Sequence, residues 1–575
     1  MAAMLGWLSM RLFCRKAVVS AACFCMAVFW LAATALPAAA QDARWRITQE
    51  RWSDADEKAW QDFVAALGGA DCWTFDECIK SAANPYRHTD PKTRFYVDCA
   101  DMPYVLRAYF AWKNGLPFAW QSAMKSSDGP GADIRYSEEG NVIVGRDSVP
   151  RAASGVNAIS VLHTLVNVVS TAMFRRDATW DEPGMFADTY SPRLDREAIV
   201  PGTIAYDVNG HASLVWKVES GGRVLIFSSH PDHSLSRTFL GREFLRTGPQ
   251  LGSIFQKFRP IEVVGATRAP NGALVGGRIV GARNADIPDF SLEQYQGSPP
   301  GSPYGWRTAS WVWNGENMDF YTYLRARLSA GELEYHPVAE MKSMMQSICF
   351  DLRSRKQAVE ISVGRGIQNM SPPDRLPRNI YGTDGVWELY STPSRDARMK
   401  TAFKEMYDLV VEFIKMDMVD APRLHYEGDN LARDLLAAYE EQNAACSISY
   451  RNSDGRTVEL SIDRIAHRLY DLSFDPYQCV ERRWGAQGEE LASCRDGAQK
   501  TRWYEAQRYL RNQIDRTYDV DMGYSIAELE SGPWGLRTGR GVEQGPDIDV
   551  KAYLTGVAQR GAGPRADIAN PAGTP

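Results

Sequence analysis

The sequence predicts an α+β protein with a mixed N-terminal half and a mostly helical C-terminal half. Its 575 residues exceed what a single hydrophobic core usually covers, which favours two or three domains. Three β-type runs follow one another after residue 201: "GTIAYDV", "HASLVWKV" and "RVLIFSS". The last two are joined by "ESGG", a typical hairpin turn. Beyond residue 310, by contrast, apolar residues recur at helical spacing.

The first 40 residues predict an export signal. "MAAMLGWLSMRLFCRK" carries three basic residues and no acid, an apolar stretch follows, and "PAAAQD" ends it. Small residues at Ala38 and Ala40 match a signal-peptide cleavage site, so we expect cleavage after Ala40 and a periplasmic or secreted bacterial protein. A retained membrane anchor is the alternative, because the apolar stretch approaches the length of a span.

The remaining chain divides by composition. Residues 41–264 predict the mixed domain, with helices near 54–67, after Cys99, and near 156–174. Residues 265–309 are rich in Gly and Pro, which indicates a linker or long surface loop, and residues 558–575 indicate a disordered tail. Residues 310–557 predict a helical domain of unknown role, with helices near 318–328, 336–355, 396–416, 430–444, 462–472 and 500–517.

The cysteines single out one thiol. Three of the ten lie in the predicted signal peptide, and an exported chain sits where structural cysteines tend to pair. Seven is an odd number, so one thiol remains, and Cys99 is the natural one. Cys99 could instead be half of a disulfide or an inert core thiol. The expected disulfide partners are Cys72 with Cys78, Cys479 with Cys494, and Cys349 with Cys446.

Cys99 stands where an extended run becomes a helical pattern, in "RFYVDCADMPYVLRAYFAWKNGLPFA". Asp98 can cap a helix whose first turn includes Cys99. In that position the helix dipole and unpaired N–H groups would lower the pKa of the thiol, and the same N–H groups could stabilise an oxyanion. Pro103 opposes this placement, because it lies close enough to Cys99 to break the first helical hydrogen bonds if Cys99 begins the helix. Either the helix starts nearer Asp101 or its first turn is distorted, and both weaken the dipole argument for Cys99.

His211 is the candidate base, because it opens a predicted strand and so projects into a cleft. Across the predicted hairpin, Ser228, His230 and Asp232 alternate and share one face of an extended segment. Any of the three could accept the second ring N–H of His211 and fix its tautomer. We rank His230 first, Asp232 second and Ser228 third.

This order of features resembles the NlpC-type cysteine peptidases, which are papain-like hydrolases of cell-wall peptides. The resemblance rests on Asp98–Cys99 before a helix, Pro201–Gly202 before a strand, His211 opening the next strand and a polar residue on the strand after it. It implies a Cys-bearing helix packed on an antiparallel sheet. It also implies Cys99 as nucleophile, His211 as base and His230 as the residue that orients the base.

The same residues resemble the transglutaminase-like branch of papain-like proteins. "CADMPYVLRAYFAWKNGLPF" parallels its cysteine helix, and "GHASLVWKV" parallels its His-Ala strand. There the third member is usually an aspartate, which would promote Asp232. That branch would pass the acyl group to an amine as well as to water.

Other function classes have little support. A net charge of −6 without a basic tract argues against nucleic acid, and no phosphate loop or spaced metal-ligand cluster indicates a cofactor or metal. We therefore expect a peptide or peptidoglycan substrate and no cofactor. The rival reading is a catalytically inactive papain-like scaffold whose helical region binds a protein partner.

Overall fold

The computed structural model describes residues 43–208, 210–231, 233–242, 244–381, 385–514, 522–532 and 543–560. The predicted signal peptide and the end of the predicted tail lie outside these ranges. The protein is mixed α and β with antiparallel sheets, as expected. No helix within these ranges combines the length and apolar character needed to cross a bilayer.

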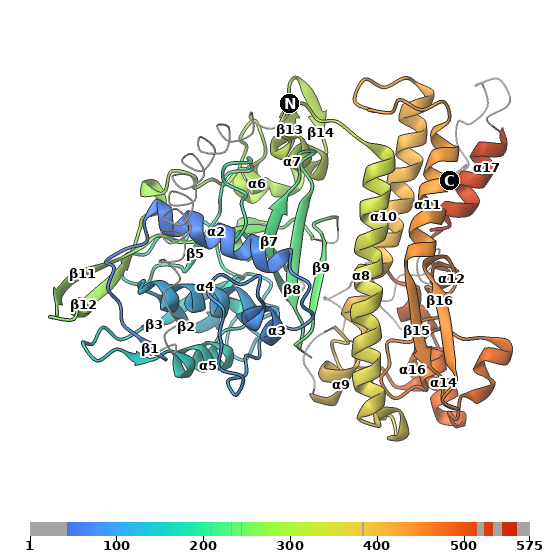
Figure 1. The fold of residues 1–575 in the computed structure, drawn as a ribbon, viewed down its shortest axis with the longest axis horizontal. Helices are drawn as coiled ribbons and strands as arrows, with labels where there is room; N and C mark the ends of the chain where they lie inside the picture. The colour runs from blue at the N-terminus through green and yellow to red at the C-terminus, as the bar shows by residue number, and fades with distance from the viewer. Residues whose placement is uncertain are drawn as a thin grey trace, which may run out of the picture.

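A six-stranded antiparallel sheet organises the N-terminal half (Figure 1). The three strands expected from alternation form its centre and pair in chain order, so the "ESGG" turn does join two neighbouring strands. The spatial order is β5 (Thr189–Tyr190), β10 (Phe255–Phe258), β6 (Ile204–Asp207), β7 (His211–Val218), β8 (Val224–Ser229) and β9 (Leu235–Phe239).

Both faces of the sheet are buried, because alternate residues of its strands enter two different cores. Tyr206 and Leu214 face α2 (Asp54–Gly68) and α4 (Asp101–Asn114). Ala205 and Val215 face the opposite core, which includes α7 (Phe320–Leu328). These covering helices hold the strand that bears His211 in a fixed position.

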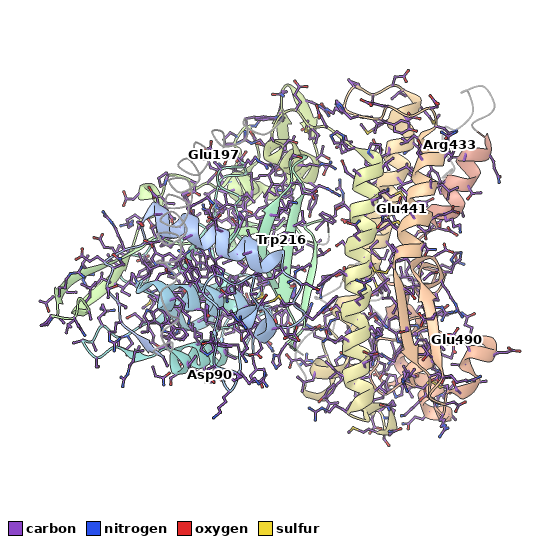
Figure 2. The ribbon with its side chains drawn as sticks, in the orientation of Figure 1. Asp90, Glu197, Trp216, Arg433, Glu441 and Glu490 are labelled. Carbon is purple, nitrogen blue, oxygen red and sulfur yellow. A yellow bond between two sulfur atoms is a disulfide. The ribbon has the colours of Figure 1, made fainter. Side chains whose placement is uncertain are left out.

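The helix α2 begins and ends for identifiable reasons. Ser53 and Asp56 form a reciprocal capping box at its start. At its end Gly68 packs directly on Trp216 of β7, where an added Cβ would lie 2.2 Å from the Trp216 Cβ. Figure 2 labels Trp216, which lies beside α2. Only glycine allows this close approach between helix and sheet.

The Gly- and Pro-rich segment is not a simple linker. Its first part forms a β-hairpin of β11 (Ile261–Arg268) and β12 (Leu274–Gly281). The two strands pair along their whole length, from Ile261 opposite Gly281 to Arg268 opposite Leu274. Three glycines within these strands, Gly265, Gly276 and Gly277, have positive φ, which glycine adopts readily. A high glycine content therefore predicted a linker or loop where the chain forms strands. A second hairpin, β2 (Ala119–Ser126) with β3 (Asn141–Ser148), spans the Gly- and Ser-rich connection.

The predicted boundary at residue 310 is also displaced. Residues between Trp311 and Leu333 pack on the sheet of the N-terminal half, so the helical half begins with α8 (Pro337–Gly364). Its core joins α8, α10 (Pro393–Met418), α11 (Leu431–Ala445) and α17 (Val550–Arg560) with the hairpin β15 (Ser447–Arg451) and β16 (Thr457–Ser461). Helix α17 extends through Ala558, the residue at which a disordered tail was expected.

The two halves meet along the edge strand β9, which lies beside α8 (Figure 1). Ser347 of α8 donates a hydrogen bond to the Arg237 carbonyl at 3.3 Å, and the rings of Trp73 and Phe350 stack at 4.7 Å. The edge of the sheet is thereby covered by a helix.

Shorter elements complete the described chain. They are β1 (Arg44–Trp45), α3 (Phe75–Lys80), β4 (Val156–Asn157), α5 (Ala158–Val168), α6 (Glu293–Gln296), β13 (Trp311–Trp313), β14 (Glu316–Met318), α9 (Gly385–Tyr390), α12 (Ile462–Ala466), α13 (Val480–Arg483), α14 (Ala498–Ala506), α15 (Arg508–Asn512) and α16 (Ile526–Glu530).

Candidate active site

Cys99 is the free cysteine of the described chain. The other six form three disulfides, in the same pairs that spacing suggested: Cys72–Cys78, Cys349–Cys446 and Cys479–Cys494. Cys99 is therefore not a half-cystine, and its sulfur is available for chemistry.

The helix after Cys99 begins later than the sequence suggested. The Asp98 carboxylate accepts hydrogen bonds from the backbone N–H groups of Ala100, at 2.8 Å, and Asp101, at 3.2 Å. These two bonds close a tight turn through Cys99. Helix α4 then starts at Asp101, so Cys99 precedes its first turn. Asp98 does cap the chain at this point, but the N–H groups it binds are not free to hold an oxyanion.

Pro103 fits this later start. It is the third residue of α4, where a backbone N–H would have no helical partner, so the missing donor costs little. The helix ends at Gly115 in the left-handed conformation, with φ of 64°. Pro103 thus marks the true beginning of the helix and does not distort it.

Electrostatics at Cys99 oppose the expected activation. Burial raises the pKa of the thiol well above its ordinary value, and the charge of Asp98 adds to this. The backbone N–H of Ala212 acts in the opposite direction, because it can stabilise a thiolate. Burial and Asp98 likewise raise the pKa of Asp101 to about 10. Burial therefore disfavours the charged forms of both the thiol and the carboxyl group in the resting site.

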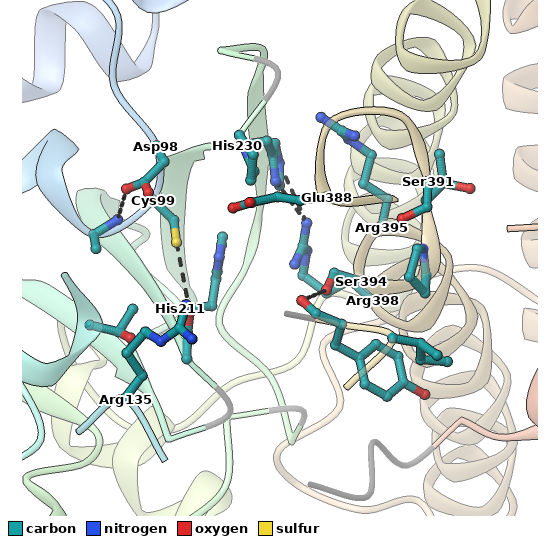
Figure 3. A pocket seen from close by; sticks show the side chains of 18 of the residues that line it. Asp98, Cys99, Arg135, His211, His230, Glu388, Ser391, Ser394, Arg395 and Arg398 are labelled. Atoms are coloured by element: carbon teal, nitrogen blue, oxygen red, sulfur yellow. Dashed lines mark hydrogen bonds between the residues drawn. The ribbon is translucent and has the colours of Figure 1, made fainter. Parts of the chain in front are cut away.

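His211 opens β7 immediately beside Cys99. The Cys99 sulfur lies 3.8 Å from the carbonyl oxygen of Gly210, the residue before His211. Gly210 has a φ of 85°, which lets the chain turn into β7 against Tyr136. Cys99 and His211 line one cavity of about 150 Å³, and Figure 3 shows their side chains on the same side of it.

Ser228, ranked last from the sequence, is the residue that holds His211. Its hydroxyl lies 3.0 Å from Nε2 of His211, and both side chains are buried. That contact engages Nε2 of the imidazole with the Ser228 hydroxyl. A hydroxyl at this distance fixes the orientation of the imidazole and can fix its tautomer.

His230, ranked first, does not bond to His211 directly. Its ring stacks on His211 with centroids 5.6 Å apart and planes 16° apart. It connects through Ser236, whose hydroxyl lies 2.9 Å from Nε2 of His230 and 3.1 Å from the Ser228 hydroxyl. The ranking was wrong in order, although both residues belong to one buried network. Asp232 lies outside the described residues.

The helical half supplies one wall of the cavity. Glu388 of α9 and two arginines of α10, Arg395 and Arg398, line it opposite Cys99 (Figure 3). Arg398 lies 3.3 Å from Nδ1 of His230, and Arg395 donates to the Ser234 hydroxyl at 2.6 Å. Sequence reasoning did not find these residues or Ser236, because no local motif ties α9, α10 or β9 to Cys99.

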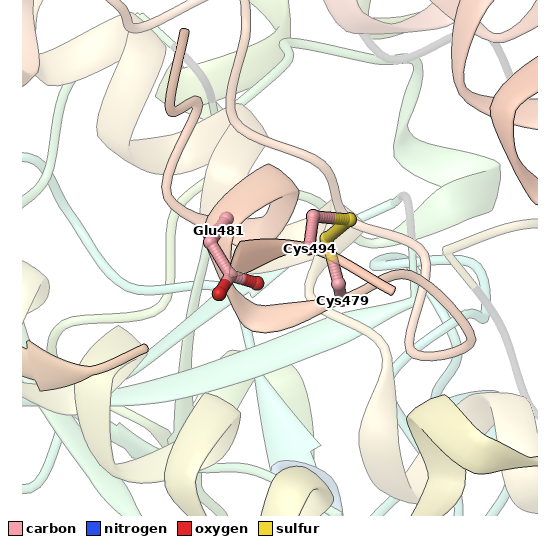
Figure 4. A group of neighbouring side chains, drawn as sticks. All are labelled: Cys479, Glu481 and Cys494. Atoms are coloured by element: carbon pink, nitrogen blue, oxygen red, sulfur yellow. A yellow bond between two sulfur atoms is a disulfide. The ribbon is translucent and has the colours of Figure 1, made fainter. Parts of the chain in front are cut away.

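Within the described ranges, one group of potential metal ligands has all its donor atoms within 4.8 Å of one another: Cys479, Glu481 and Cys494 (Figure 4). The two sulfurs form a disulfide, so neither is a thiolate that could bind a metal. The Glu481 carboxylate accepts hydrogen bonds from the Ser453 and Ser493 hydroxyls. This group is a structural crosslink beside a satisfied carboxylate.

No protein-family model, curated protein or solved structure matches this chain. The functional reading consequently rests on the site itself.

Proposed function

We propose that the protein is an exported cysteine hydrolase that cleaves an amide bond through a thioester on Cys99, in a papain-like arrangement. The observation that carries this proposal is the meeting of a free thiol and a strand-opening histidine in one cavity, with Ser228 on the far nitrogen of that histidine. A nucleophile, a base and a group that orients the base are the parts that acyl transfer through a thiol needs.

The proposed reaction begins from the neutral pair. Nδ1 of His211 takes the thiol proton as the sulfur attacks the amide carbonyl, so a C–S bond forms and the carbonyl electrons move to oxygen. The tetrahedral intermediate collapses with cleavage of the C–N bond, and His211 returns the proton to the leaving amine. Water then attacks the thioester, gives a proton to His211, and releases the acid and the Cys99 thiol.

The raised pKa of Cys99 shapes this mechanism. A resting thiolate–imidazolium pair is disfavoured by burial, so the proton transfer accompanies attack on the substrate instead of preceding it. His211 is therefore required as a base in the first step. The Ala212 N–H assists, because it is placed to stabilise negative charge on the sulfur.

The size of the cavity limits what it can hold. About 150 Å³ is small beside ordinary ligand pockets of roughly 300–1,000 Å³. It suits the groups next to the scissile bond and not a whole extended peptide. Cell-wall peptides are the substrates we favour, by analogy with the NlpC-type resemblance and the predicted export.

A test compares the wild-type chain with Cys99→Ala and His211→Ala on a panel of cell-wall peptides. Mass spectrometry of the products, with and without an added amine, separates hydrolysis from acyl transfer. We expect cleavage that both substitutions abolish. Equal turnover by the wild-type protein and Cys99→Ala would refute the proposal.

A second candidate, an inactive binding protein, is favoured by the surroundings of the thiol: burial raises the pKa of Cys99, and Asp98 holds the N–H groups of Ala100 and Asp101. On this alternative the wild-type protein binds cell-wall peptides without cleaving them. Equilibrium binding measured beside the cleavage assay distinguishes the two.

A further inference from the structure

Two histidines and one glutamate come together where the chain enters the helical half. Glu334 and His336 lie directly before α8, and His425 lies beyond the end of α10. Nε2 of His425 is 3.2 Å from one carboxylate oxygen of Glu334, and Nε2 of His336 is 3.8 Å from the other. The two imidazole rings have their centroids 5.4 Å apart. A single carboxylate therefore lies within reach of two imidazoles.

The backbone brings these side chains together. Tyr335 forms a parallel bridge with Leu424. In this bridge the Tyr335 N–H donates to the Arg423 carbonyl at 2.8 Å, and the Tyr335 carbonyl accepts from the His425 N–H at 2.9 Å. Tyr335 and Leu424 pack against the core of the helical half. Since side chains alternate along extended segments, the residues that flank the bridge fall on the opposite side, away from that core.

Further contacts fix the backbone of His336. Pro337 follows it and disfavours a helical backbone at that position. The His336 N–H donates to the buried Glu340 carboxylate at 3.0 Å. The side chains of Glu334, His336 and His425 are 45%, 56% and 47% exposed, so they can rotate while their backbone stays in place.

The geometry suits a tetrahedral transition metal. Zn²⁺ binds imidazole nitrogens and carboxylate oxygens at about 2.0–2.2 Å, and two histidines with one glutamate are a known ligand set for it. At those distances, neighbouring ligand atoms of a tetrahedral site lie about 3.4 Å apart. The two nitrogen–oxygen separations, 3.2 Å and 3.8 Å, lie on either side of that value. The two nitrogens then have to approach each other, which rotation of the exposed rings allows.

An ordinary ion pair is the alternative, because a histidine beside a carboxylate is common on protein surfaces. The chain has such a pair at His467, whose Nε2 is 3.5 Å from the Asp549 carboxylate. Glu334 differs because two imidazoles flank its carboxylate, which could balance the charge of only one imidazolium. A dication that accepts a lone pair from each neutral imidazole, and the charge of the carboxylate, uses all three groups at once.

We propose that Glu334, His336 and His425 bind one zinc-type divalent cation, with water in the fourth position. Imidazole ligands favour Zn²⁺, Ni²⁺ or Cu²⁺ over Mg²⁺ and Ca²⁺, which prefer oxygen. The cation would tie the beginning of α8 to the segment after α10. Because the unfolded chain does not hold the three ligands together, binding stabilises the folded chain. None of the three is among the described residues that line the Cys99 cavity, so the inference stands apart from the proposed function.

Zinc titration of the full chain, purified without a histidine tag and treated with EDTA, tests the site directly. Competition with a chromophoric zinc indicator at about pH 7.5, where an ordinary imidazole is mostly neutral, should give one Zn²⁺ per chain. Mg²⁺ or Ca²⁺ in large excess should not displace it. We expect His336→Ala, His425→Ala and Glu334→Gln each to weaken Zn²⁺ binding at least about tenfold, because each removes a direct ligand. Added Zn²⁺ should raise the melting temperature of the wild-type chain, EDTA should reverse the rise, and each variant should respond less.

Two controls separate this site from other zinc ligands of the chain. His467→Ala removes a histidine that is 58% exposed and also contacts a carboxylate, and it should leave the zinc affinity unchanged. Cys99→Ala removes the free thiol and should leave that affinity unchanged as well. Absence of zinc binding by the wild-type chain would overturn the inference. So would wild-type affinity in the His336→Ala, His425→Ala double variant, or loss of binding in either control.

Discussion

Removal of the Ser228 hydroxyl tests the geometry of the proposed base. Ser228→Ala deletes the 3.0 Å hydrogen bond to Nε2 of His211 and breaks the link to Ser236. A neutral hydrogen bond contributes about 1 kcal/mol net, and 1.4 kcal/mol is a tenfold change in rate. We therefore expect acylation of Cys99 to slow about fivefold to tenfold. His211→Ala removes the base and should cost about a hundredfold or more.

The neighbouring serine provides a matched control. Ser229 lies next to Ser228 on β8, is fully buried, and donates to the Val97 carbonyl at 2.8 Å. Ser229→Ala thus loses a buried hydrogen bond of the same kind without touching His211. Both variants should lower the melting temperature by similar amounts, and only Ser228→Ala should lower the rate.

Acylation is measured with p-nitrophenyl acetate, whose release of p-nitrophenolate reports thioester formation in a stopped-flow instrument. Intact-mass analysis confirms that the acetyl group is on Cys99. A wild-type rate in Ser228→Ala, or equal losses in Ser228→Ala and Ser229→Ala, would refute the role assigned to Ser228.

Three other predictions follow from the same structure. Because burial raises the pKa of Cys99, iodoacetamide at pH 8 should alkylate it at least about tenfold more slowly in the folded chain than in urea, and equal rates would contradict the buried neutral thiol. Burial raises the pKa of Asp101 to about 10. Between about pH 4 and pH 10 the folded state therefore keeps a proton that the unfolded state loses. The free energy of unfolding should fall by about 1.4 kcal/mol for each unit by which the pH rises. Asp101→Asn should remove that slope in urea unfolding at pH 5 and pH 8, and an unchanged slope would show that Asp101 is ionised. The Cys349–Cys446 disulfide joins residues 97 apart, so replacing both with alanine should lower the free energy of unfolding by about 2–5 kcal/mol, and no change in urea unfolding would contradict this.

The sequence allowed His211 to be singled out because strand alternation and the glycine before it are local signals. The hydrogen-bond partner of His211 depends on how β7 and β8 are paired. Continuing the β7–β8 register places His230 opposite His211, which explains why their rings stack. The hydrogen bond instead runs diagonally to Ser228, two residues along the strand, because diagonal neighbours on one face are also within reach. Alternation identifies the shared face but does not choose between these two positions.

The start of α4 shows a second limit. Asp98 was predicted to cap a helix whose first turn includes Cys99, yet its carboxylate accepts hydrogen bonds from the N–H groups of Ala100 and Asp101, and the helix begins only at Asp101. Because the helix begins at Asp101, Cys99 precedes its first turn and does not benefit from the helix dipole. Cys99 lies instead in a turn where burial raises the pKa of its thiol. Pro103 was the local signal for this outcome, since it suits the first turn of a helix that begins at Asp101.

Contacts between the halves could not be read from the sequence. Arg398 is separated from His230 by more than 160 residues, and nothing in the helical pattern of α10 marks the two arginines that line the cavity. The same holds for Ser236, which sits on an edge strand that sequence periodicity did not reveal. Residues that act through tertiary packing need the fold before their role can be stated.

The most direct test of the central claim is the intact mass of the chain during reaction with an amide or ester substrate. Rapid acid quenching followed by mass spectrometry should reveal one acyl group per chain, located on Cys99 by peptide mapping and released by hydroxylamine, as a thioester requires. Cys99→Ala should give no adduct, and His211→Ala should form it at least about a hundredfold more slowly. Product formation without any adduct on Cys99, or an adduct that forms at the same rate without His211, would contradict the account.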